Sequence, residues 1–429
     1  MTDVHVDVMV VGAGHAGLSA SYYLQQHGIK HVLVEKGKIG ESWRSQRWDS
    51  FKLNTANKLN GLPGKPYQGN NEEGFSSRAD FIKSMEEYVS AFALPVVENA
   101  TVVAIERTEG SDLFKTMVHH NGTAKIYTSK KVILTSGDSN KKKVPTFAPL
   151  ISDHVKQFHT SEYRNPQSLP TGDVLVVGSG QSGCQITEDL LEAGKKVFLS
   201  TSLVPRIPRR YRGKDIMDWL IGTGFMDVKT HEVPDPKMLT MRVPLLSGIG
   251  RLGHTISLQS LAKKGAILVG KMENADEKNV HFQENAAMHV KFADGFSEMV
   301  KTTIDEFILN QQLVSPPREV DEEDLPDTTV SCASSIKKLD LQKNNITSVI
   351  WATGFGADFS YVKLPITDQA GNLKHKNGIM DVDGLYLLGY HWLRNRKSTL
   401  IYGIREDAEF IVEEVKRSLH LKNRARTLS

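Results

Sequence analysis

Two glycine-rich turns in this chain have the residue types and spacing that bind the pyrophosphate of a dinucleotide. The first is Gly12-Ala-Gly14-His-Ala-Gly17, which follows the apolar run 8–11 and precedes a helix-like segment, 18–26. In this pattern Gly12 permits a tight turn, Gly14 lets the backbone approach a pyrophosphate, and Gly17 lets the helix pack closely on the strand. The free N–H groups and the dipole at the start of the helix then favour an anion.

An acidic residue at the end of the next strand indicates which nucleotide binds to the first turn. Residues 31–34 form a short apolar run, and Glu35 follows it directly, before Lys36. A carboxylate at this place accepts hydrogen bonds from a ribose 2′-hydroxyl and repels a 2′-phosphate. The first site is therefore predicted to hold FAD or NAD rather than NADP, with Glu35 and Lys36 among its contacts.

The second turn, Gly178-Ser-Gly180-Gln-Ser-Gly183, repeats the first unit with matching spacing. It lies between the apolar run 174–177 and a helix-like segment, 184–192. The position that corresponds to Glu35 is Thr201 in this unit. Because no carboxylate stands there, a 2′-phosphate is not repelled. The second site is therefore predicted to bind NADPH rather than NADH.

Polar and basic residues beside Thr201 supply candidate ligands for the phosphate. Ser202 follows directly, and Arg206, Arg209 and Arg210 come soon after. Arginine suits a phosphate because its guanidinium presents a fixed fork of donors. We predict that Thr201, Ser202 and Arg206 bind the 2′-phosphate. The sequence leaves open which of the three arginines makes this contact, and a solvated basic loop is the alternative interpretation.

Composition limits the class of protein. At 429 residues, the chain is long enough for two or three domains. Charged residues make up 24% of it and apolar residues 39%, as is typical of a folded globular protein. The net charge of +3 is too small for a nucleic-acid-binding protein, and no apolar run is long enough to span a membrane.

The cysteines exclude several kinds of site. Cys184 and Cys332 are the only two, they lie far apart, and no C-x-x-C motif is present. A disulfide scaffold, a four-ligand zinc site and a C-x-x-C dithiol relay are therefore not expected. We predict no metal site and a reducing, cytoplasmic compartment.

These patterns predict an α/β protein with two Rossmann-like, dinucleotide-binding domains. We expect an FAD-binding domain over residues 1–160 and 335–429, with an NADPH-binding domain, 165–330, inserted in it. Segment 203–260 is too long for a simple loop, so we expect it to form an insertion that covers the substrate pocket. Two dinucleotide sites in one chain suggest that NADPH reduces a flavin, which then reduces something else.

Further short segments carry a family resemblance. They are Gly40-Glu-Ser-Trp43-Arg44, Leu53-Asn54-Thr55, the strand-like runs 132–137 and 349–354, and the C-terminal stretches 384–389 and 397–403. Together with the two glycine turns, they resemble the flavin-containing monooxygenase family over nearly the whole chain. Small bacterial members and plant YUCCA-type enzymes are the most similar.

The resemblance implies roles for particular residues. Asn54 would be the main catalytic polar residue, on the floor of the active site. The segment with Trp43 and Arg44 would pack beside the flavin, and Gln181 would face the nicotinamide. The remaining residues expected to contact a cofactor are Thr55, Gly137, Ser182, Gly354, Gly389, Tyr402 and Gly403.

The resemblance also implies an activity: NADPH reduces FAD, and the reduced FAD adds O2 to form a C4a-hydroperoxyflavin. The distal oxygen then passes to a small soft nucleophile, which we expect to be a sulfide, an amine or an indole-like compound. The aromatic strip Tyr390-His-Trp392 is the expected lining of the substrate pocket. O2 and a small-molecule substrate would thus be the partners, and whether the chain forms a homodimer is left open.

Two departures from the family pattern narrow this expectation. Of the family's F-x-G-x-x-x-H-x-x-x-Y/F fingerprint only His159 and Tyr163 survive, and Tyr163 stands where the Baeyer–Villiger fingerprint has tryptophan. Oxidation of ketones is therefore disfavoured. Leu203 occupies the place where the family often has its NADPH arginine, so NADH use stays open.

Three alternatives to a monooxygenase remain at this stage. An NAD(P)H oxidase, or a flavin-dependent reductase without a dithiol relay, would use the same two cofactors. A dinucleotide-sensing regulator would need only binding, and it would not need Trp43 or Asn54.

Overall fold

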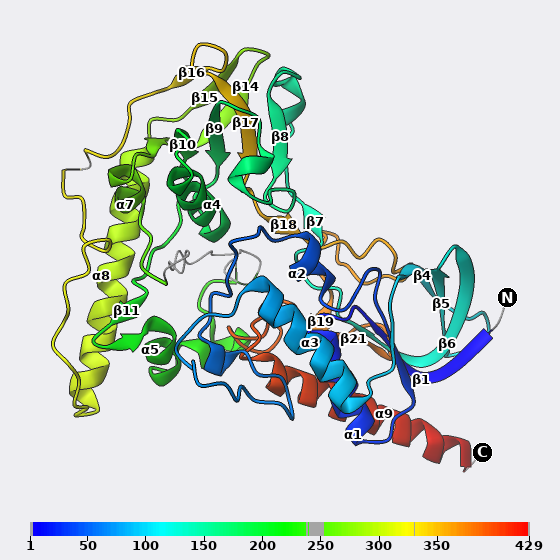
Figure 1. Ribbon diagram of the computed structural model, residues 1–429. Helices are drawn as coiled ribbons and strands as arrows, with labels where there is room; N and C mark the ends of the chain where they lie inside the picture. Colours follow the sequence, from blue (N-terminus) through cyan, green and yellow to red (C-terminus); the bar gives the residue numbers. More distant parts are fainter. Residues whose placement is uncertain (1–2, 237–238, 240–252, 330, 428–429) are drawn as a thin grey trace.

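The computed structural model describes residues 3–236, 239, 253–329 and 331–427 (Figure 1). It contains two large sheets, one with parallel strands at its centre and one parallel throughout, and the two units that they form lie side by side (Figure 1). This arrangement confirms the predicted α/β class with two Rossmann-like units.

The first sheet has the order β19-β20-β21-β6-β1-β2-β3, and β4 and β5 extend it beyond β6 as an antiparallel pair. Its central strands are parallel, and residues 8–11, 31–34 and 132–134 at their carboxyl ends are buried, as is typical of a sheet covered on both faces. The strands are β1 (Asp3–Val11), β2 (His31–Val34), β3 (Val96–Val97), β4 (Ala100–Arg107), β5 (Phe114–His120), β6 (Thr123–Leu134), β19 (His375–Lys376), β20 (Ile379–Met380) and β21 (Leu385–Leu387).

Helices of the first unit come from both ends of the chain. The N-terminal α1 packs against the C-terminal α9, and α3 also contacts α1 (Figure 1). A full capping box at Ser77 and Asp80 fixes the start of α3. The helices are α1 (His15–Gln26), α2 (Glu41–Ser45), η1 (Asn57–Leu59), α3 (Arg78–Phe92) and α9 (Ile404–Thr427).

The second sheet is parallel throughout, with the order β13-β10-β9-β17-β8. These strands are β8 (Lys156–His159), β9 (Asp173–Val177), β10 (Val197–Ser200), β13 (Ile267–Val269) and β17 (Ile346–Trp351). A small antiparallel sheet joins β14 (Met272–Ala275), β15 (Asn279–Phe282) and β16 (Lys338–Asp340), and a hairpin joins β11 (Arg210–Tyr211) and β12 (Lys214–Asp215).

The remaining elements cover the second sheet or link the two units. The helices are α4 (Gln181–Glu192), α5 (Ile216–Gly222), α7 (Leu258–Lys263) and α8 (Ala286–Asn310). Short 3-10 helices are η2 (Ala148–Leu150), η3 (Pro166–Ser168), η4 (Phe225–Asp227) and η5 (Thr230–Glu232). Strands β7 (Lys141–Lys142) and β18 (Phe355–Gly356) pair with each other where the chain passes between the units.

The strand pairing shows where the chain changes units. Both β8 and β17 pair in the second sheet, although the domain limits predicted from the sequence put 156–159 and 346–351 in the first unit. After β17 the chain returns to the first sheet with a bridge between Val362 and Ile105 of β4, and then with β19 to β21. This pairing favours boundaries near residues 140 and 356, and the division into domains stays a proposal. Of the insertion predicted at 203–260, residues 237–238 and 240–252 lie outside the described part.

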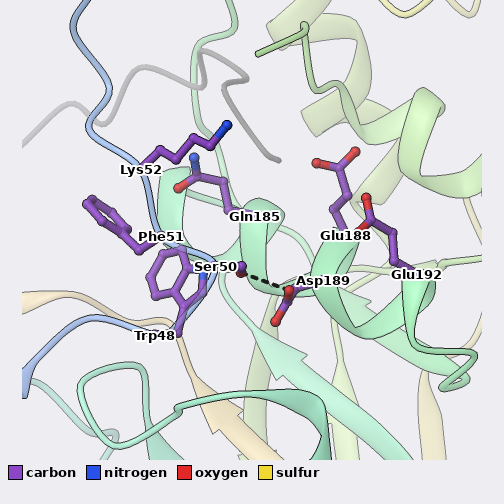
Figure 2. Close-up of a pocket in the computed structure, with 8 residues that line it drawn as sticks. All are labelled: Trp48, Ser50, Phe51, Lys52, Gln185, Glu188, Asp189 and Glu192. Atoms are coloured by element: carbon purple, nitrogen blue, oxygen red, sulfur yellow. Dashed lines mark hydrogen bonds between the residues drawn. The ribbon is translucent and has the colours of Figure 1, made fainter. Parts of the chain in front are cut away.

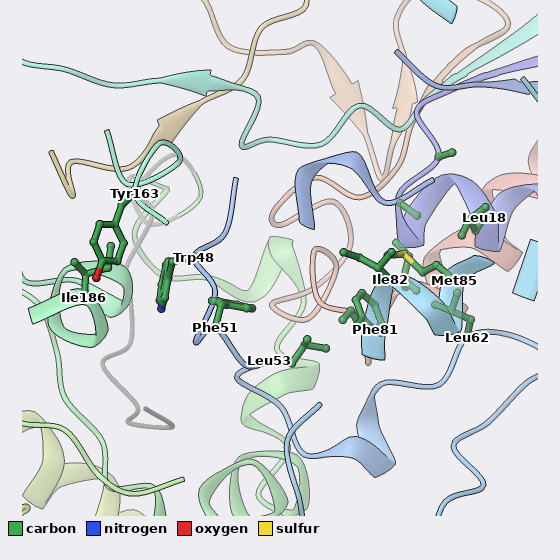
Figure 3. Packing of buried hydrophobic residues seen from close by; sticks show 14 of the residues in the cluster. Leu18, Trp48, Phe51, Leu53, Leu62, Phe81, Ile82, Met85, Tyr163 and Ile186 are labelled. Atoms are coloured by element: carbon green, nitrogen blue, oxygen red, sulfur yellow. The ribbon is translucent and has the colours of Figure 1, made fainter. Parts of the chain in front are cut away.

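One buried apolar cluster extends through both units. Trp48 and Phe51 of the first unit lie between Tyr163 and Ile186 of the second unit and the residues packed around Phe81 (Figure 3). The rings of Trp48 and Phe51 meet edge to face at 5.0 Å. The two units are therefore joined by a common apolar interior. Among the described helices, none is both long and apolar enough to cross a membrane.

Candidate cofactor and active site

The two glycine turns have nearly identical backbone geometry. Gly12 has φ +111° and Gly178 has φ +107°, values that L side chains rarely adopt. A Cβ at Gly17 would lie 1.9 Å from the Gly12 carbonyl oxygen, and a Cβ at Gly183 would lie 1.9 Å from the Gly178 carbonyl oxygen. Both units therefore require the first glycine of the motif for its positive φ and the third glycine for the close packing of helix on strand, as predicted from the sequence.

Each glycine turn leads directly into the N-terminus of a helix. Helix α1 begins at His15 with Gly14 as its N-cap, and α4 begins at Gln181, followed by Ser182, with Gly180 as its N-cap. A Cβ at Gly14 would meet no described atom within 4 Å, so the space beside this N-cap admits a ligand. The backbone N–H groups of a helix's first turn and the helix dipole fit an anionic pyrophosphate.

Glu35 lies at the end of β2, buried against the first turn. Its Oε2 accepts a hydrogen bond from the Ala13 N–H at 2.7 Å, and its Oε1 accepts one from the Gly37 N–H at 3.1 Å. Burial raises the pKa of this carboxyl group, and the two backbone donors oppose the rise. The structure thus places Glu35 against the turn that would hold the nucleotide, while Lys36 is exposed beside it.

In the second unit, the corresponding threonine is buried and bonds to other protein groups. Thr201 is 1% exposed, and its hydroxyl bonds to the Val269 carbonyl and to His289 Nδ1, both at 2.9 Å. Ser202 is half-buried, and its N–H donates to Ser179 Oγ at 2.9 Å. Of the two predicted polar ligands, Ser202 is therefore the more accessible.

The prediction that Arg206 binds a 2′-phosphate conflicts with the structure. Arg206 is 0% exposed, and its guanidinium bonds to Asp294 Oδ1 at 2.6 Å and to Asp324. Lys301 adds a second positive charge at Asp324, 2.6 Å away. The positive charge of Arg206 is therefore already balanced inside the unit. A phosphate could reach Arg206 only if the cluster of Arg206, Lys301, Asp294 and Asp324 came apart.

The other two arginines differ from each other. Arg209 is buried and pairs with Asp215. Arg210 is exposed, with one donor on the Gly213 carbonyl at 2.9 Å and another nitrogen 3.9 Å from Glu73. Of the three arginines, Arg210 alone is exposed, so it is the one that a ligand could reach without rearrangement.

Asn54 lies where the two units meet. Its Oδ1 accepts from Gln185 Nε2 of α4 at 3.5 Å, and its backbone carbonyl accepts from Arg209 Nη1 at 3.0 Å. Because Gln185 donates to Asn54 Oδ1, the Nδ2 group is the part of the Asn54 amide that can donate to a ligand. Thr55 turns its hydroxyl to Asn60 within the same loop.

Trp43 and Arg44 lie on the short helix α2. The Trp43 ring packs edge to face on Phe81 at 5.1 Å, and the Arg47 guanidinium lies 5.3 Å above it. Arg44 donates from Nε to the Ile39 carbonyl at 2.9 Å and pairs with Glu86 of α3. Arg44 thus joins α2 to α3, and its expected contact with a flavin stays a prediction.

C-terminal glycines complete the surroundings of the first turn. A Cβ at Gly389 would lie 2.6 Å from the Ala16 Cβ, so this glycine lies directly against the first turn of α1. Gly403 has the Lys397 carbonyl 2.2 Å from its virtual Cβ, and the Tyr402 ring lies 5.3 Å from Lys397 Nζ. The closing segment therefore folds back on itself beside α1.

Two other predicted glycines follow the strands that flank the turns. Gly137 (φ +76°) follows β6 in the first unit, and Gly354 (φ +80°) follows β17 in the second. The Gly354 carbonyl accepts from His159 Nε2 at 2.9 Å, with the imidazole acting as donor. Burial lowers the pKa of His159, so the imidazole is held in its neutral form.

A small pocket marks the junction of the units. It is lined by Trp48, Ser50, Phe51 and Lys52 of the first unit and by Gln185, Glu188, Asp189 and Glu192 of α4 (Figure 2). Ser50 donates to Asp189 at 2.8 Å across it. Its volume of about 10 Å³ has room for about one water molecule, so the described conformation holds no substrate here.

The sequence did not single out Gln185 or the part that Arg209 plays. Gln185 stands one helical turn after Gln181, and that spacing puts both on one face of α4, so the signal was present. The hydrogen bond from Arg209 to Asn54 joins residues that are 155 positions apart, so no local sequence pattern predicts it. In the aromatic strip, the Tyr390 and His391 rings stack with their centres 4.2 Å apart, and the role of the strip as the lining of a substrate pocket stays a prediction.

Comparison with known proteins gives consistent matches. The family described as pyridine nucleotide-disulphide oxidoreductase matches residues 9–216. An uncharacterized CzcO-like oxidoreductase of Geobacillus kaustophilus is 30% identical over 413 residues, covering 96% of this chain and 98% of that protein. Indole-3-pyruvate monooxygenase YUCCA1 of Oryza sativa subsp. japonica is 25% identical over 313 residues, 69% of this chain and 75% of that protein.

A solved structure supports the fold. A flavin-containing monooxygenase from Stenotrophomonas maltophilia superimposes with a TM-score of 0.64 at 18% identity, covering 96% of this chain and 99% of that one. At this level of identity the likeness concerns the architecture, which is that of two dinucleotide-binding units.

Proposed function

Because the chain belongs to the flavin-containing monooxygenase family, whose members are NAD(P)H-dependent flavoprotein oxidoreductases, we propose that it uses NADPH and O2 to oxygenate a small soft nucleophile. One oxygen atom would pass to a sulfide, an amine or an indole-like compound, and the other would leave as water. NADPH and a proton supply the two electrons and the hydrogen that this balance needs.

The observation that carries the proposal is the pair of matched turns at Gly12 and Gly178, with Asn54 lying between the units that contain them. The first turn fits FAD because Glu35 supplies a buried carboxylate for a ribose and Gly389 closes against α1. The second fits NADPH because Thr201 replaces the acid. Bound there, FAD relays electrons from NADPH to O2.

The residues of this chain would hold the reactants and keep them dry. Asn54 offers a neutral amide donor from Nδ2, which can orient a cofactor without adding a charge to a desolvated site. Gln185 orients that amide through its Oδ1. Ser202 and Arg210 are the accessible candidates for the 2′-phosphate, and Arg206 would support the loop that carries them.

A dithiol relay has no support in the chain. Cys184 is fully buried, and burial raises the pKa of its thiol. Burial together with Asp327 raises the pKa of Cys332 to about 12. Since the thiolate is the reactive form, neither cysteine is prepared for exchange at neutral pH. The alternative that stays is an NAD(P)H oxidase or a reductase that needs no dithiol.

A spectroscopic experiment tests the proposal. Purified protein should carry FAD, bleach on addition of NADPH without air, and then, with isotopically labelled O2 and a panel of sulfides, amines and indoles, give products that contain one labelled oxygen. Protein that cannot be loaded with FAD would contradict the proposal. NADPH oxidation that yields only H2O2 for every compound would favour the oxidase.

Asn54→Ala tests the site itself. We expect flavin reduction by NADPH to stay within about threefold of the wild type, while H2O2 replaces most of the oxygenated product, because a lost hydrogen bond of about 1 kcal/mol is enough to misplace a reactant. The matched variant Asn54→Asp keeps the shape but not the donor, and it should leak in the same way. Unchanged coupling in both variants would remove Asn54 from the site.

A further inference from the structure

We propose that Arg209 is a positioning residue for Asn54: it holds the Asn54 main chain from the opposite unit, so that docking of the second unit sets the place of the catalytic amide. The catalytic consequence rests on the function proposed above. The positioning itself rests on contacts alone.

Arg209 reaches across the boundary between the units. It is 1% exposed, Nη1 donates to the Asn54 carbonyl at 3.0 Å, and the guanidinium lies 5.0 Å from the centre of the Phe75 ring. Its charge is balanced by Asp215, which is equally buried. Asn54 and Phe75 belong to the first unit, and Arg209 and Asp215 to the second.

The arginine is firmly anchored on its own side. Its N–H donates to Thr255 Oγ1 at 2.7 Å, and its carbonyl accepts from the Ile216 N–H at 2.9 Å. Asp215 Oδ1 also caps α5 by accepting from the Met217 N–H at 2.8 Å. A group fixed at both its main chain and its counter-ion can transmit the position of one unit to the other.

The segment that it holds lies antiparallel to residues 74–77, with an isolated β-bridge between Lys52 and Ser77. The Leu53 N–H donates to the Ser76 carbonyl at 3.0 Å, and the Asn57 N–H donates to the Gly74 carbonyl at 2.8 Å. Arg209 contacts one of these two segments at Asn54 and the other at Phe75. Because Gln185 bonds the Asn54 side chain, the second unit holds both the main chain and the amide of this residue.

The ion pair with Asp215 uses Nη2 of Arg209 and leaves Nη1 for the Asn54 carbonyl. Arginine and aspartate usually form two parallel hydrogen bonds. Here Arg209 Nε and Asp215 Oδ2 have no hydrogen-bond partner among the described residues. The pair therefore gives up a second bond, while Nη1 is spent on the Asn54 carbonyl. Among the described residues, Arg206, three positions earlier, bonds only to groups of its own unit.

The test compares three variants. Arg209→Gln removes the contact but leaves Asp215 as a buried, unpaired charge, which could unfold the unit. The double variant Arg209→Gln/Asp215→Asn removes both charges and so restores stability without restoring the contact. Arg212→Gln is the matched control, since Arg212 lies on the same hairpin and pairs with Asp305 at 2.6 Å within the second unit.

The first measurement is amide hydrogen exchange of the segment 53–58, made on the purified protein with its cofactor as isolated. We expect exchange to be about tenfold faster in the double variant than in the wild type, which corresponds to a charge-assisted hydrogen bond of about 1.5 kcal/mol. Arg212→Gln should leave it unchanged. Wild-type exchange in the double variant, or equally fast exchange in Arg212→Gln, would overturn the proposal.

The second measurement is the ratio of H2O2 to oxygenated product. The double variant should release several-fold more H2O2 per NADPH while the rate of flavin reduction is unchanged, and a merely structural role would not separate these two quantities. Wild-type coupling together with fast exchange would overturn the catalytic consequence. If the wild type gives no product at all, the proposed function fails, and hydrogen exchange still decides the positioning.

Discussion

The two glycine turns share one backbone and differ at the ends of the neighbouring strands. In the first unit, Glu35 turns both oxygens toward backbone N–H groups beside the turn. In the second, Thr201 turns its hydroxyl inward to Val269 and His289. The comparison teaches that spacing and glycine fix the shape of such a site, whereas the choice of nucleotide depends on a few side chains at one strand end.

The largest expected effect on stability concerns the buried ion pairs of Arg206 with Asp294 and Asp324 in the second unit. Arg206→Ala should lower the free energy of unfolding by about 3–5 kcal/mol, because Asp294 and Asp324 lose a buried partner. Chemical denaturation measures this, and any loss of activity should be equal with NADPH and NADH. Arg210→Ala is the control and should change stability by less than about 0.5 kcal/mol. Normal stability with a loss confined to NADPH would restore Arg206 as a phosphate ligand.

A second test asks whether the turns are equivalent. Gly17→Ala and Gly183→Ala should each destabilise the protein by about 2–3 kcal/mol, because the new Cβ would meet a carbonyl oxygen at 1.9 Å. Their ligand effects should separate: the first should lose flavin, and the second should keep flavin but no longer be reduced by NADPH. Flavin content and thermal unfolding measure the two outcomes.

Gly295→Ala supplies the control for these glycine variants. It lies on α8 with no described atom within 4 Å of a Cβ, and the change should stabilise the protein by about 0.5–1 kcal/mol. If Gly17→Ala and Gly183→Ala lost flavin to the same extent, the assignment of one cofactor to each turn would be wrong.

The third effect is that of the first unit's acid. Glu35→Gln keeps the size of the side chain but removes the negative charge that accepts hydrogen bonds from the Ala13 and Gly37 N–H groups. The change should weaken these hydrogen bonds by about 1–2 kcal/mol in total. FAD should then bind about tenfold more weakly, as measured by titration of flavin-free protein. Glu41→Gln, at a half-buried acid at the start of α2, should leave FAD binding unchanged.

The smallest effect comes from giving the second unit an acid. Ser202→Asp puts a carboxylate on the accessible residue next to Thr201, so the KM for NADPH should rise about tenfold while the KM for NADH changes little. Ser202→Thr keeps the hydroxyl and should stay within about threefold of the wild type. Equal rises with both nucleotides would show that Ser202 lies away from the 2′-phosphate.

The sequence predicted the parts of the site that depend on short-range geometry. The turn glycines, the strand before each of them and the position of Glu35 follow from steric rules that act within about 20 residues. The burial of Arg206 does not follow from the sequence, for the opposite reason. Its partners Asp294 and Asp324 are 88 and 118 positions away, and a buried arginine has the same letter as an exposed one.

Long-range pairing also explains why the sequence leaves the domain boundaries undecided. Residues 346–351 have the apolar composition of any buried strand, which does not say which sheet they join. Their partner β9 was decided by the fold as a whole. Asn54 lies between these extremes, because its segment was recognisable but the contacts that hold it, from Gln185 and Arg209, come from the other unit.

The nested path of the chain has a consequence for synthesis. The second sheet is complete once β17 is made, but the first sheet still lacks β21, and Ala16 lacks the glycine that lies against it. At about 5–20 residues per second, the ribosome needs roughly 2–7 seconds to pass from residue 351 to residue 387. During that interval the later unit can be folded while the earlier one still exposes an open strand edge. A nascent chain of this kind would benefit from early capture by a chaperone or by flavin.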